Sequence, residues 1–431
     1  MKRFGLLFIA LLVFGAGVLF ANGQAQSTSQ QSQKQATPEQ KVLTALWFYD
    51  DPAELDLLNK KAAEYSEAHP GVTIKVNTVA YDDLFPRVAQ LVAAGTPPDI
   101  VKLTDIRPEI EPFVQDLSQY LGKDFLKPFI PGLQSAMTRD GKIVGAPLDV
   151  TANGIILNKT LFEKAGVAIP PKDKPWTWDQ FLRDVGQVKQ KTGALYGLVW
   201  DVTPHRWATY LFENGGSFYD ETGTKANFNT PQAVQALRGF AKMFDDGYIP
   251  KSIWIGSENP RDMFFSGNSV AWMSGSWQVK AMIESLKDFQ WTAGPNPYVT
   301  ARSSVLGYKF VSAFSNSKYP EIAADFIKFF TSKENNIEYA KSLMTIAART
   351  DTGTIDYKNP QATEALNNLA YELQVSPLAA SKDVTNPAMG YVWNTVKENV
   401  QLVLTKQKTP EQAAADVNAN ITEALAAVKG N

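Results

Sequence analysis

The sequence contains no cysteine and only two histidines, His69 and His205, which lie far apart along its 431 residues. A structural zinc site and a thiol nucleophile therefore lack their usual side chains, and any metal would have to be held by carboxylates. We expect no metal and no other cofactor. Without cysteine, the chain also cannot carry the lipid-modified residue that anchors a lipoprotein.

The sequence also lacks an excess of charge of either sign. It has 42 lysines and arginines against 44 aspartates and glutamates, for a formal net charge of -2. A protein that binds a phosphate backbone needs a clear positive surplus. We therefore expect no nucleic-acid partner.

Long hydrophobic runs are missing except at the N-terminus. Lys2 and Arg3 precede an apolar run from Phe4 to Ala21, and the small residues Gly23 and Ala25 follow it. This pattern predicts a signal peptide over residues 1–25, with export by the general secretory (Sec) route to the periplasm or the medium. The run is also long enough for an uncleaved membrane anchor, which stays open as an alternative.

Residues 26–40 are rich in glutamine, serine and threonine and contain no aromatic residue. Such a segment has too little apolar surface to fold, so we expect a flexible leader.

From Lys41 onward, strand-like and helix-like segments alternate. Residues 42–49, 72–79 and 97–103 read as strands, and residues 53–71 and 82–95 between them read as amphipathic helices. Strand and helix in alternation predict a parallel sheet covered by helices.

The rest of the chain is richer in helix. Thr177 and Gln180 have the spacing of a capping box, and Thr230-Pro231 is a helix start. In the last segment, 410–429, apolar residues recur at helical spacing.

Six segments resemble, in order and spacing, the extracellular solute-binding proteins, family 1, of bacterial ABC sugar importers, to which the maltose-binding protein belongs. They are LFPRVAQLVAAGTPPDIVKLTD, DGKIVGAPLDVTANGIILNKTLFEKAG, KPWTWDQFL, ENGGSFYDETGTKANFNTPQAVQAL, MFFSGNSVAWMSGSW and YPEIAADFIKFFTSKE. The resemblance extends from about Lys41 to the C-terminus.

The resemblance implies an α/β fold: the two-lobed, type II periplasmic binding protein fold, in which each lobe is a mostly parallel sheet flanked by helices. Residues 41–148 and 305–344 would form the N-terminal lobe, and 149–304 and 349–431 the C-terminal lobe, with three crossings between them. A mono- or oligosaccharide would bind in the cleft between the lobes and pass to the permease subunits of an ABC transporter. We expect a monomer with no enzymatic activity.

The resemblance also suggests ligand-binding residues at matching positions. Asp50, Asp51 and Asp105 follow strands, and Trp277 closes the SGSW segment where the family has a stacking ring. Near Asp105 the maltose-type aromatic residue is replaced by Lys102 or Leu103, which argues against a maltodextrin ligand. The full set of candidates is Asp50, Asp51, Asp105, Asp149, Thr151, Arg206, Trp207, Trp277, Gly307, Tyr308, Arg349, Trp393 and Lys397.

Several candidates have a structural explanation as well. An aspartate after a strand is often a helix N-cap, and a tryptophan such as Trp277 or Trp393 is often part of a core. Lys397 could be solvated, and Arg349 could pair with Asp351.

Two other functions remain open from the sequence. A family 1 protein could bind a polyamine, through acidic groups, or glycerol phosphate, through arginines or helix N-termini. A secreted glycoside hydrolase would also combine export, tryptophans and carboxylates, with Asp50, Asp105 or Asp149 as candidates for its acidic pair. No segment carries a hydrolase signature.

Overall fold

The computed structural model describes residues 40–49, 51–107 and 109–429, except the side chain of Lys429. The predicted signal peptide, the leader before Gln40 and the candidate Asp50 lie outside the described residues. Residues from Gln40 onward form one unit.

The strands of this unit are mostly short, apart from β6, which is 13 residues long. Their bounds are β1 Lys41–Trp47, β2 Val72–Thr78, β3 Ile100–Leu103, β4 Thr138–Arg139, β5 Lys142–Ile143, β6 Ala146–Asn158, β7 Tyr196–Trp200, β8 Ser269–Gly275, β9 Trp291–Ala293, β10 Leu306–Ala313 and β11 Ile346–Ala347.

The α-helices cover the faces of the sheet. Their bounds are α1 Pro52–Ala68, α2 Leu84–Ala93, α3 Ser118–Leu121, α4 Pro131–Ala136, α5 Lys159–Ala165, α6 Trp178–Thr192, α7 Pro204–Glu213, α8 Pro231–Asp245, α9 Lys251–Trp254, α10 Pro260–Phe265, α11 Val279–Ser285, α12 Pro320–Phe330, α13 Lys333–Leu343, α14 Pro360–Val375, α15 Leu378–Val384, α16 Trp393–Leu404 and α17 Pro410–Lys429.

The strand order is β2-β1-β3-β10-β6-β8-β7, with β9 and β11 also paired to β6. β1 runs parallel to β2 and β3, as the alternation of strands and helices predicts. β10 and β6 are antiparallel to their neighbours, because each enters the sheet from the opposite end. The α/β architecture is therefore confirmed, but the sheets are mixed rather than mostly parallel.

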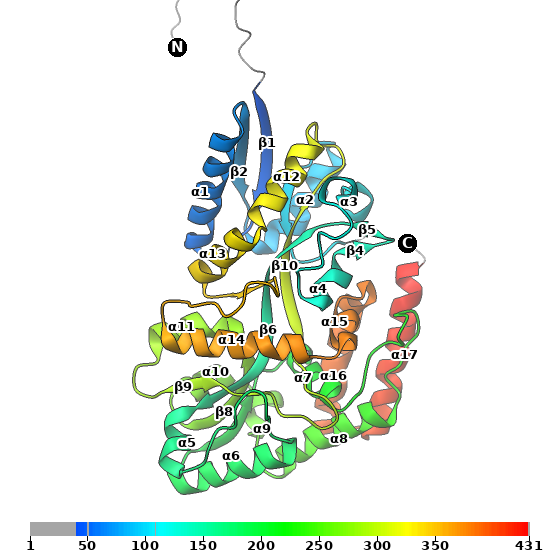
Figure 1. Ribbon diagram of the computed structural model, residues 1–431. Helices are drawn as coiled ribbons and strands as arrows, with labels where there is room; N and C mark the ends of the chain where they lie inside the picture. Colours follow the sequence, from blue (N-terminus) through cyan, green and yellow to red (C-terminus); the bar gives the residue numbers. More distant parts are fainter. Residues whose placement is uncertain (1–39, 50, 108, 430–431) are drawn as a thin grey trace, which may run out of the picture. The chain divides into compact units, whose positions relative to one another are not determined.

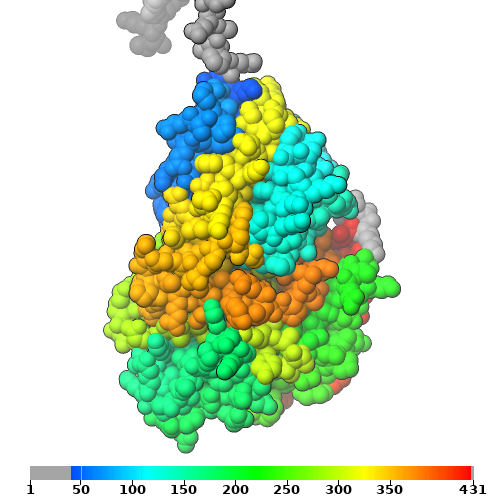
Figure 2. Space-filling view, viewed as in Figure 1, coloured from blue at the N-terminus to red at the C-terminus, as the bar shows by residue number. Residues whose placement is uncertain are grey.

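Two bodies of structure lie on either side of the long strands β6 and β10 (Figure 1). One holds β1, β2, β3, α1, α12 and α13, and the other holds β7, β8, α5 and α6. In Figure 2 the yellow segment around α12 and α13 packs beside the blue and cyan segments of the first 150 residues. The residue at which each lobe begins and ends stays a prediction.

Three strands meet side by side where the two bodies join. On one side of β6, Gly307, Tyr308 and Lys309 of β10 pair with Thr151, Val150 and Asp149. On its other side, Ile346 of β11 pairs with Val150. We call β6, β10 and β11 the crossing strands.

Local sequence explains how several helices begin. The Thr177 hydroxyl and the Gln180 side chain form the predicted capping box of α6, and the Thr230 hydroxyl caps α8. Val417 and Ile421 of α17 are buried, as the helical spacing predicts. Among the described residues, no helix is both long and apolar enough to cross a membrane.

Candidate functional site

Two neighbouring cavities lie against the crossing strands, and Asp149, Thr151 and Lys309 line both of them. The first has a volume of about 520 Å³, and we call it the aromatic cavity, after the rings of Phe48, Tyr81, Tyr308 and Trp393 that line it. The second has a volume of about 410 Å³, and we call it the polar cavity, after Asp51, Glu54, Lys280 and Glu284. Both volumes fall in the range typical of small-molecule sites.

A larger hollow of about 810 Å³ lies between the 217–227 loop, α15 and the end of α17. It does not contact the crossing strands. We therefore take the two cavities beside those strands as the candidate site.

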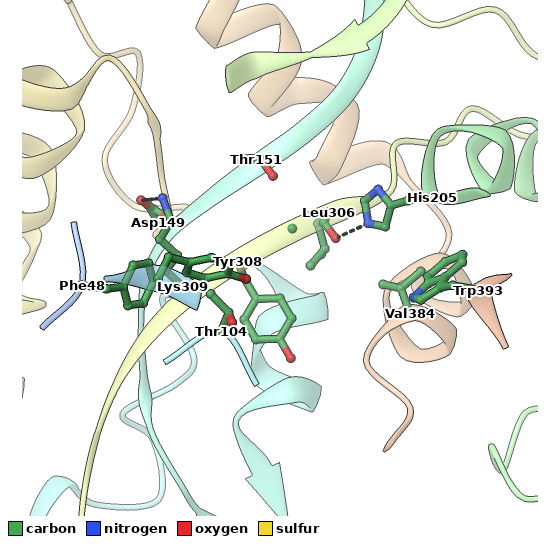
Figure 3. Close-up of a pocket in the computed structure, with 12 residues that line it drawn as sticks. Phe48, Thr104, Asp149, Thr151, His205, Leu306, Tyr308, Lys309, Val384 and Trp393 are labelled. Carbon is green, nitrogen blue, oxygen red and sulfur yellow. Dashed lines mark hydrogen bonds and ion pairs between the residues drawn. The ribbon is translucent and has the colours of Figure 1, made fainter. Parts of the chain in front are cut away.

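The aromatic cavity has rings on opposite sides (Figure 3). On one side, the buried Phe48 ring follows β1 and packs edge-on against Tyr81, with 5.1 Å between the ring centroids. Tyr81 is 51% exposed, so much of its ring is open to a ligand. On the other side, the Trp393 ring lies 5.6 Å from the His205 ring. This arrangement could hold a flat molecule between two aromatic walls.

Asp149 occupies the centre of the site, on β6. Its side chain is buried, and Oδ2 accepts a hydrogen bond from the Lys309 ammonium at 3.5 Å. Oδ1 has no hydrogen-bond partner. Burial raises the pKa of Asp149, while Lys309 and Lys102 oppose this rise. A buried acceptor without a donor is costly, so Asp149 is suited to accept a hydrogen bond from a ligand hydroxyl when the cavities rearrange around the ligand.

A buried ion pair lies behind Asp149. The Lys102 ammonium, fully buried on β3, donates to the Phe48 carbonyl at 3.1 Å and pairs with Glu54 of α1. The same Glu54 oxygen accepts hydrogen bonds from Trp47 Nε1 and the Tyr339 hydroxyl, each at 2.8 Å. This network joins β1, β3, α1 and α13 beneath the site.

Thr151 and Gly307 face each other across the pair of crossing strands. A Cβ atom at Gly307 would lie 2.6 Å from the Thr151 hydroxyl oxygen, so only glycine allows this approach. Tyr308, the next residue, lines the aromatic cavity, and its pKa is raised mainly by burial and further by the charge of Asp105.

His205 lines the aromatic cavity from the start of α7. Its Nδ1 lies 3.3 Å from the Asn153 amide nitrogen, and its Nε2 lies 3.3 Å from the Leu306 carbonyl oxygen. Burial lowers the pKa of His205 to about 3, and the charge of Arg206 adds to the effect. The ring is therefore neutral at physiological pH and holds α7 against β6 and β10 as a hydrogen-bonding group.

Trp277 lines the polar cavity from the short turn after β8 and is half-buried. The Arg206 guanidinium lies over its ring, with the central carbon 4.0 Å from the ring centroid. The ring also lies close to Gly275, where a Cβ atom would come within 2.1 Å of it. In this structure the indole is neither a core ring nor an uncovered platform, because a cation occupies one face.

Of three other predicted residues, only Asp51 lines a cavity. Asp51 lines the polar cavity and caps α1, where its Oδ1 accepts a hydrogen bond from Ala53 N at 3.0 Å. Asp105 is exposed beside Thr104, which lines the aromatic cavity, and its Oδ1 accepts from Ile106 N at 2.8 Å. Lys397 is half-buried on α16 and lines neither cavity.

Trp207 and Arg349 also line neither cavity, and we correct both predictions. Trp207 is fully buried, because it lies on the inward face of α7 and packs against Phe228 at 6.1 Å between ring centroids. Arg349 pairs with Asp351 through two hydrogen bonds of 2.9 and 2.7 Å, which is the alternative that the sequence left open. Burial and a closer partner, respectively, explain why neither faces the crossing strands.

Tyr81, Lys102, His205 and Lys280 are among the residues of the site that were not predicted. Tyr81 follows β2, whereas the predicted candidates Asp50, Asp51 and Asp105 follow β1 and β3. Lys102 interrupts the apolar strand IVKL, which was a visible signal of a buried charge with a partner. Nothing in the sequence pairs Lys280 with Asp51 or places His205 beside Leu306, because both contacts join distant segments.

Comparison with known proteins agrees with this fold. A model of the bacterial extracellular solute-binding protein family matches residues 50–337. The lactose-binding protein of Rhizobium radiobacter is 23% identical over 313 residues, covering 70% of this chain and 72% of that protein. The diacetylchitobiose binding protein DasA of Streptomyces coelicolor is 22% identical over 403 residues, covering 88% and 89%.

A solved structure also shares the fold. The sugar-binding protein MalE from Xanthomonas citri superimposes with a TM-score of 0.75 at 17% identity, covering 90% of this chain and 98% of that one. The type II periplasmic binding protein fold is thereby confirmed. The proteins named here are binding proteins rather than enzymes.

Proposed function

This chain belongs to the bacterial extracellular solute-binding protein family, and from that premise we propose that it binds a sugar between two lobes and delivers it to an ABC transporter. The ligand is a mono- or oligosaccharide that enters an open cleft and is enclosed when the lobes close. The protein acts as an exported monomer, in the periplasm or the medium, and its partner is the permease of the transporter.

One observation carries the proposal. The aromatic cavity places exposed and half-buried rings, Tyr81 and Trp393, on opposite sides of polar groups at the crossing strands. The apolar face of a pyranose stacks on such rings, and its hydroxyls bond to short polar side chains such as Thr104 and Thr151. The similarity to lactose-, diacetylchitobiose- and other sugar-binding proteins supports the same class of ligand.

We assign the roles accordingly. Tyr81, Tyr308 and Trp393 are stacking or wall residues, Thr151 and Asp149 bond hydroxyls, and Gly307 lets the crossing strands approach. Trp277 contacts the ligand through its ring, either after Arg206 moves off the indole or while Arg206 still covers one face of it. Asp50, Asp105 and Lys397 stay predictions, and Trp207 and Arg349 are left out.

The lobes are 41–148 plus 305–344 and 149–304 plus 349–431, with the crossing strands as the hinge. The long strands β6 and β10 support this division, because β10 pairs with β3 of one body, β6 pairs with β8 of the other, and β6 and β10 pair with each other. Hinges of a few connecting strands are typical of proteins that close around a ligand.

A thermal-shift screen followed by calorimetry tests the ligand class. The panel contains lactose, N,N′-diacetylchitobiose, maltose, several monosaccharides, spermidine and glycerol 3-phosphate. A sugar at one hundred times its dissociation constant should stabilise the protein by about 2.7 kcal/mol. Stabilisation by spermidine or glycerol 3-phosphate alone would contradict the sugar assignment.

The absence of catalysis is tested with the same ligand. After incubation with pure protein, the sugar should be recovered chemically unchanged. Hydrolysis of the sugar by pure protein would favour a glycoside hydrolase instead.

A further inference from the structure

One ion pair joins the two bodies of structure at the polar cavity. Asp51 stands at the start of α1, which packs against β2 and α13, and Lys280 lies on α11, which follows β8. The carboxylate of Asp51 and the ammonium of Lys280 form a hydrogen-bonded ion pair. The two residues are 229 positions apart in the chain.

Both oxygens of Asp51 already have donors. Oδ1 accepts from Ala53 N in the N-cap of α1, and Oδ2 accepts from Lys280. The Lys280 ammonium holds the pKa of Asp51 below its usual range. The carboxylate is therefore charged and engaged within the protein, which differs from the sugar contact predicted for it from the sequence.

The position of the pair matters as much as its chemistry. Both residues line the polar cavity, and so do Leu343, Met344 and Thr345 at the approach to β11. The side chains are 24% exposed for Asp51 and 40% for Lys280, so the pair lies at the boundary with solvent. Opening of the two bodies at this end would separate the two charges.

We propose that Asp51 and Lys280 form a latch that favours the closed arrangement of the lobes and thereby strengthens ligand binding. The proposal rests on the proposed function in that it treats closure as the step that traps the sugar. Asp51 and Lys280 are positioning residues, since neither needs to touch the ligand.

The direction of the effect follows from the two-state equilibrium. The latch is intact when the lobes are closed, with or without ligand, and is broken when they are open. It therefore stabilises the liganded state fully and the unliganded ensemble only in proportion to its closed fraction. Breaking the latch should open the unliganded protein and weaken binding.

The first experiment measures closure without any ligand. Because the chain contains no cysteine, Asn59→Cys on α1 and Gln190→Cys on α6, both exposed positions, give a clean pair of spin-label sites. Distances between the labels are measured by pulsed electron resonance. Lys280→Met and Asp51→Asn should each shift the distribution to longer distances, and Asn keeps the N-cap acceptor of α1. Lys280→Arg should restore the parent distribution.

The matched control is Lys242→Met, which removes an exposed ion pair with Asp246 at the C-terminal end of α8 and changes the net charge equally. It should leave the distance distribution unchanged. An unchanged distribution in Lys280→Met would overturn the latch, as would an equal shift in Lys242→Met.

The second experiment measures binding with lactose and N,N′-diacetylchitobiose as probes. Lys280→Met should weaken binding by about three- to fivefold, mainly through faster release, as expected for a partly exposed ion pair. The loss should shrink at about 0.5 M salt, where such pairs are screened. Asp51→Asn should add nothing to Lys280→Met, since each change breaks the same pair.

The outcomes separate the two proposals. A large loss in Asp51→Asn with none in Lys280→Met would show that Asp51 binds the sugar directly, and the latch would be wrong. If neither probe nor any other sugar binds, the proposed function fails, while the label distances still decide whether the latch exists.

Discussion

The aromatic cavity and the polar cavity share Asp149, Thr151 and Lys309 but differ in whether their other side chains already have partners within the protein. In the aromatic cavity Tyr81 is 51% exposed, so much of its ring is open to a ligand. In the polar cavity Asp51 is already paired with Lys280, and Glu54 is already paired with Lys102. Groups with unused binding capacity are suited to a ligand, and groups with satisfied partners are suited to hold the protein in one arrangement.

The buried pair beneath the polar cavity should give the largest effect on stability. Lys102→Met leaves the Glu54 carboxylate buried with no cation, although Trp47 and Tyr339 still donate to it. We expect the free energy of unfolding to fall by about 3–5 kcal/mol, measured by denaturant titration at neutral pH. Adding Glu54→Gln should recover most of the loss, because no unpaired charge then remains. A single variant as stable as the parent would show that this network is not structural.

The aromatic cavity should give the largest effect on binding. Tyr81→Ala removes an exposed ring, so the melting temperature of the unliganded protein should hardly change. Sugar affinity should fall by about thirtyfold, since a central aromatic contact is worth about 2 kcal/mol. Tyr391, which is 57% exposed and does not line the cavity, is the control, and Tyr391→Ala should bind normally. Equal affinity of the two variants would remove Tyr81 from the site.

Trp277 lines the polar cavity but carries an aromatic ring. It therefore tests whether only the aromatic cavity supplies rings to the ligand. Because Arg206 covers one face of the indole, we expect Trp277→Ala to weaken binding by about tenfold, less than Tyr81→Ala. The unliganded protein should lose only about 1 kcal/mol with the cation–π contact. Calorimetry and thermal melting measure the two effects. A loss of about 3–5 kcal/mol in stability would instead identify a core ring.

At neutral pH the smallest effect is that of His205 in the aromatic cavity, and it grows as the pH falls. The folded protein binds a proton at this ring only near pH 3, whereas an unfolded histidine does so near 6.5. The contribution of His205 to stability is therefore complete above pH 6.5 and is lost as pH falls, by up to about 1.4 kcal/mol per pH unit. His205→Gln should remove this slope from the difference between the two unfolding profiles. Identical profiles from pH 4 to 7 would mean that the ring is accessible to protons.

Particular residues show how far sequence reasoning extends. Alternating apolar segments predicted β1, α1, β2, α2 and β3, and capping residues predicted the start of α6 and α8. Of the candidate site residues, Asp149, Thr151, Gly307, Tyr308 and Trp393 line the aromatic cavity. Trp207 does not line it. Successive side chains of a helix point about a quarter-turn or more apart, so Trp207 points away from its neighbour Arg206 and into the core. Arg349 does not line it either, because its guanidinium pairs with Asp351, two residues later in the chain.

The sequence by itself determined the secondary structure, the family and the chemical kinds of residue at the crossing strands. These depend on periodicity, on capping over three or four residues and on the order of segments along the chain, all of which are local or linear. Only the tertiary structure decided that Lys280 meets Asp51, that Arg206 covers Trp277, and that Lys102 is buried against Glu54. Each of these contacts joins segments that are between 48 and 229 residues apart or that lie on different elements, and their geometry depends on how the helices and strands pack. A change of a few ångströms in that packing would turn a paired charge into a ligand contact, and no local pattern of residues records such a distance.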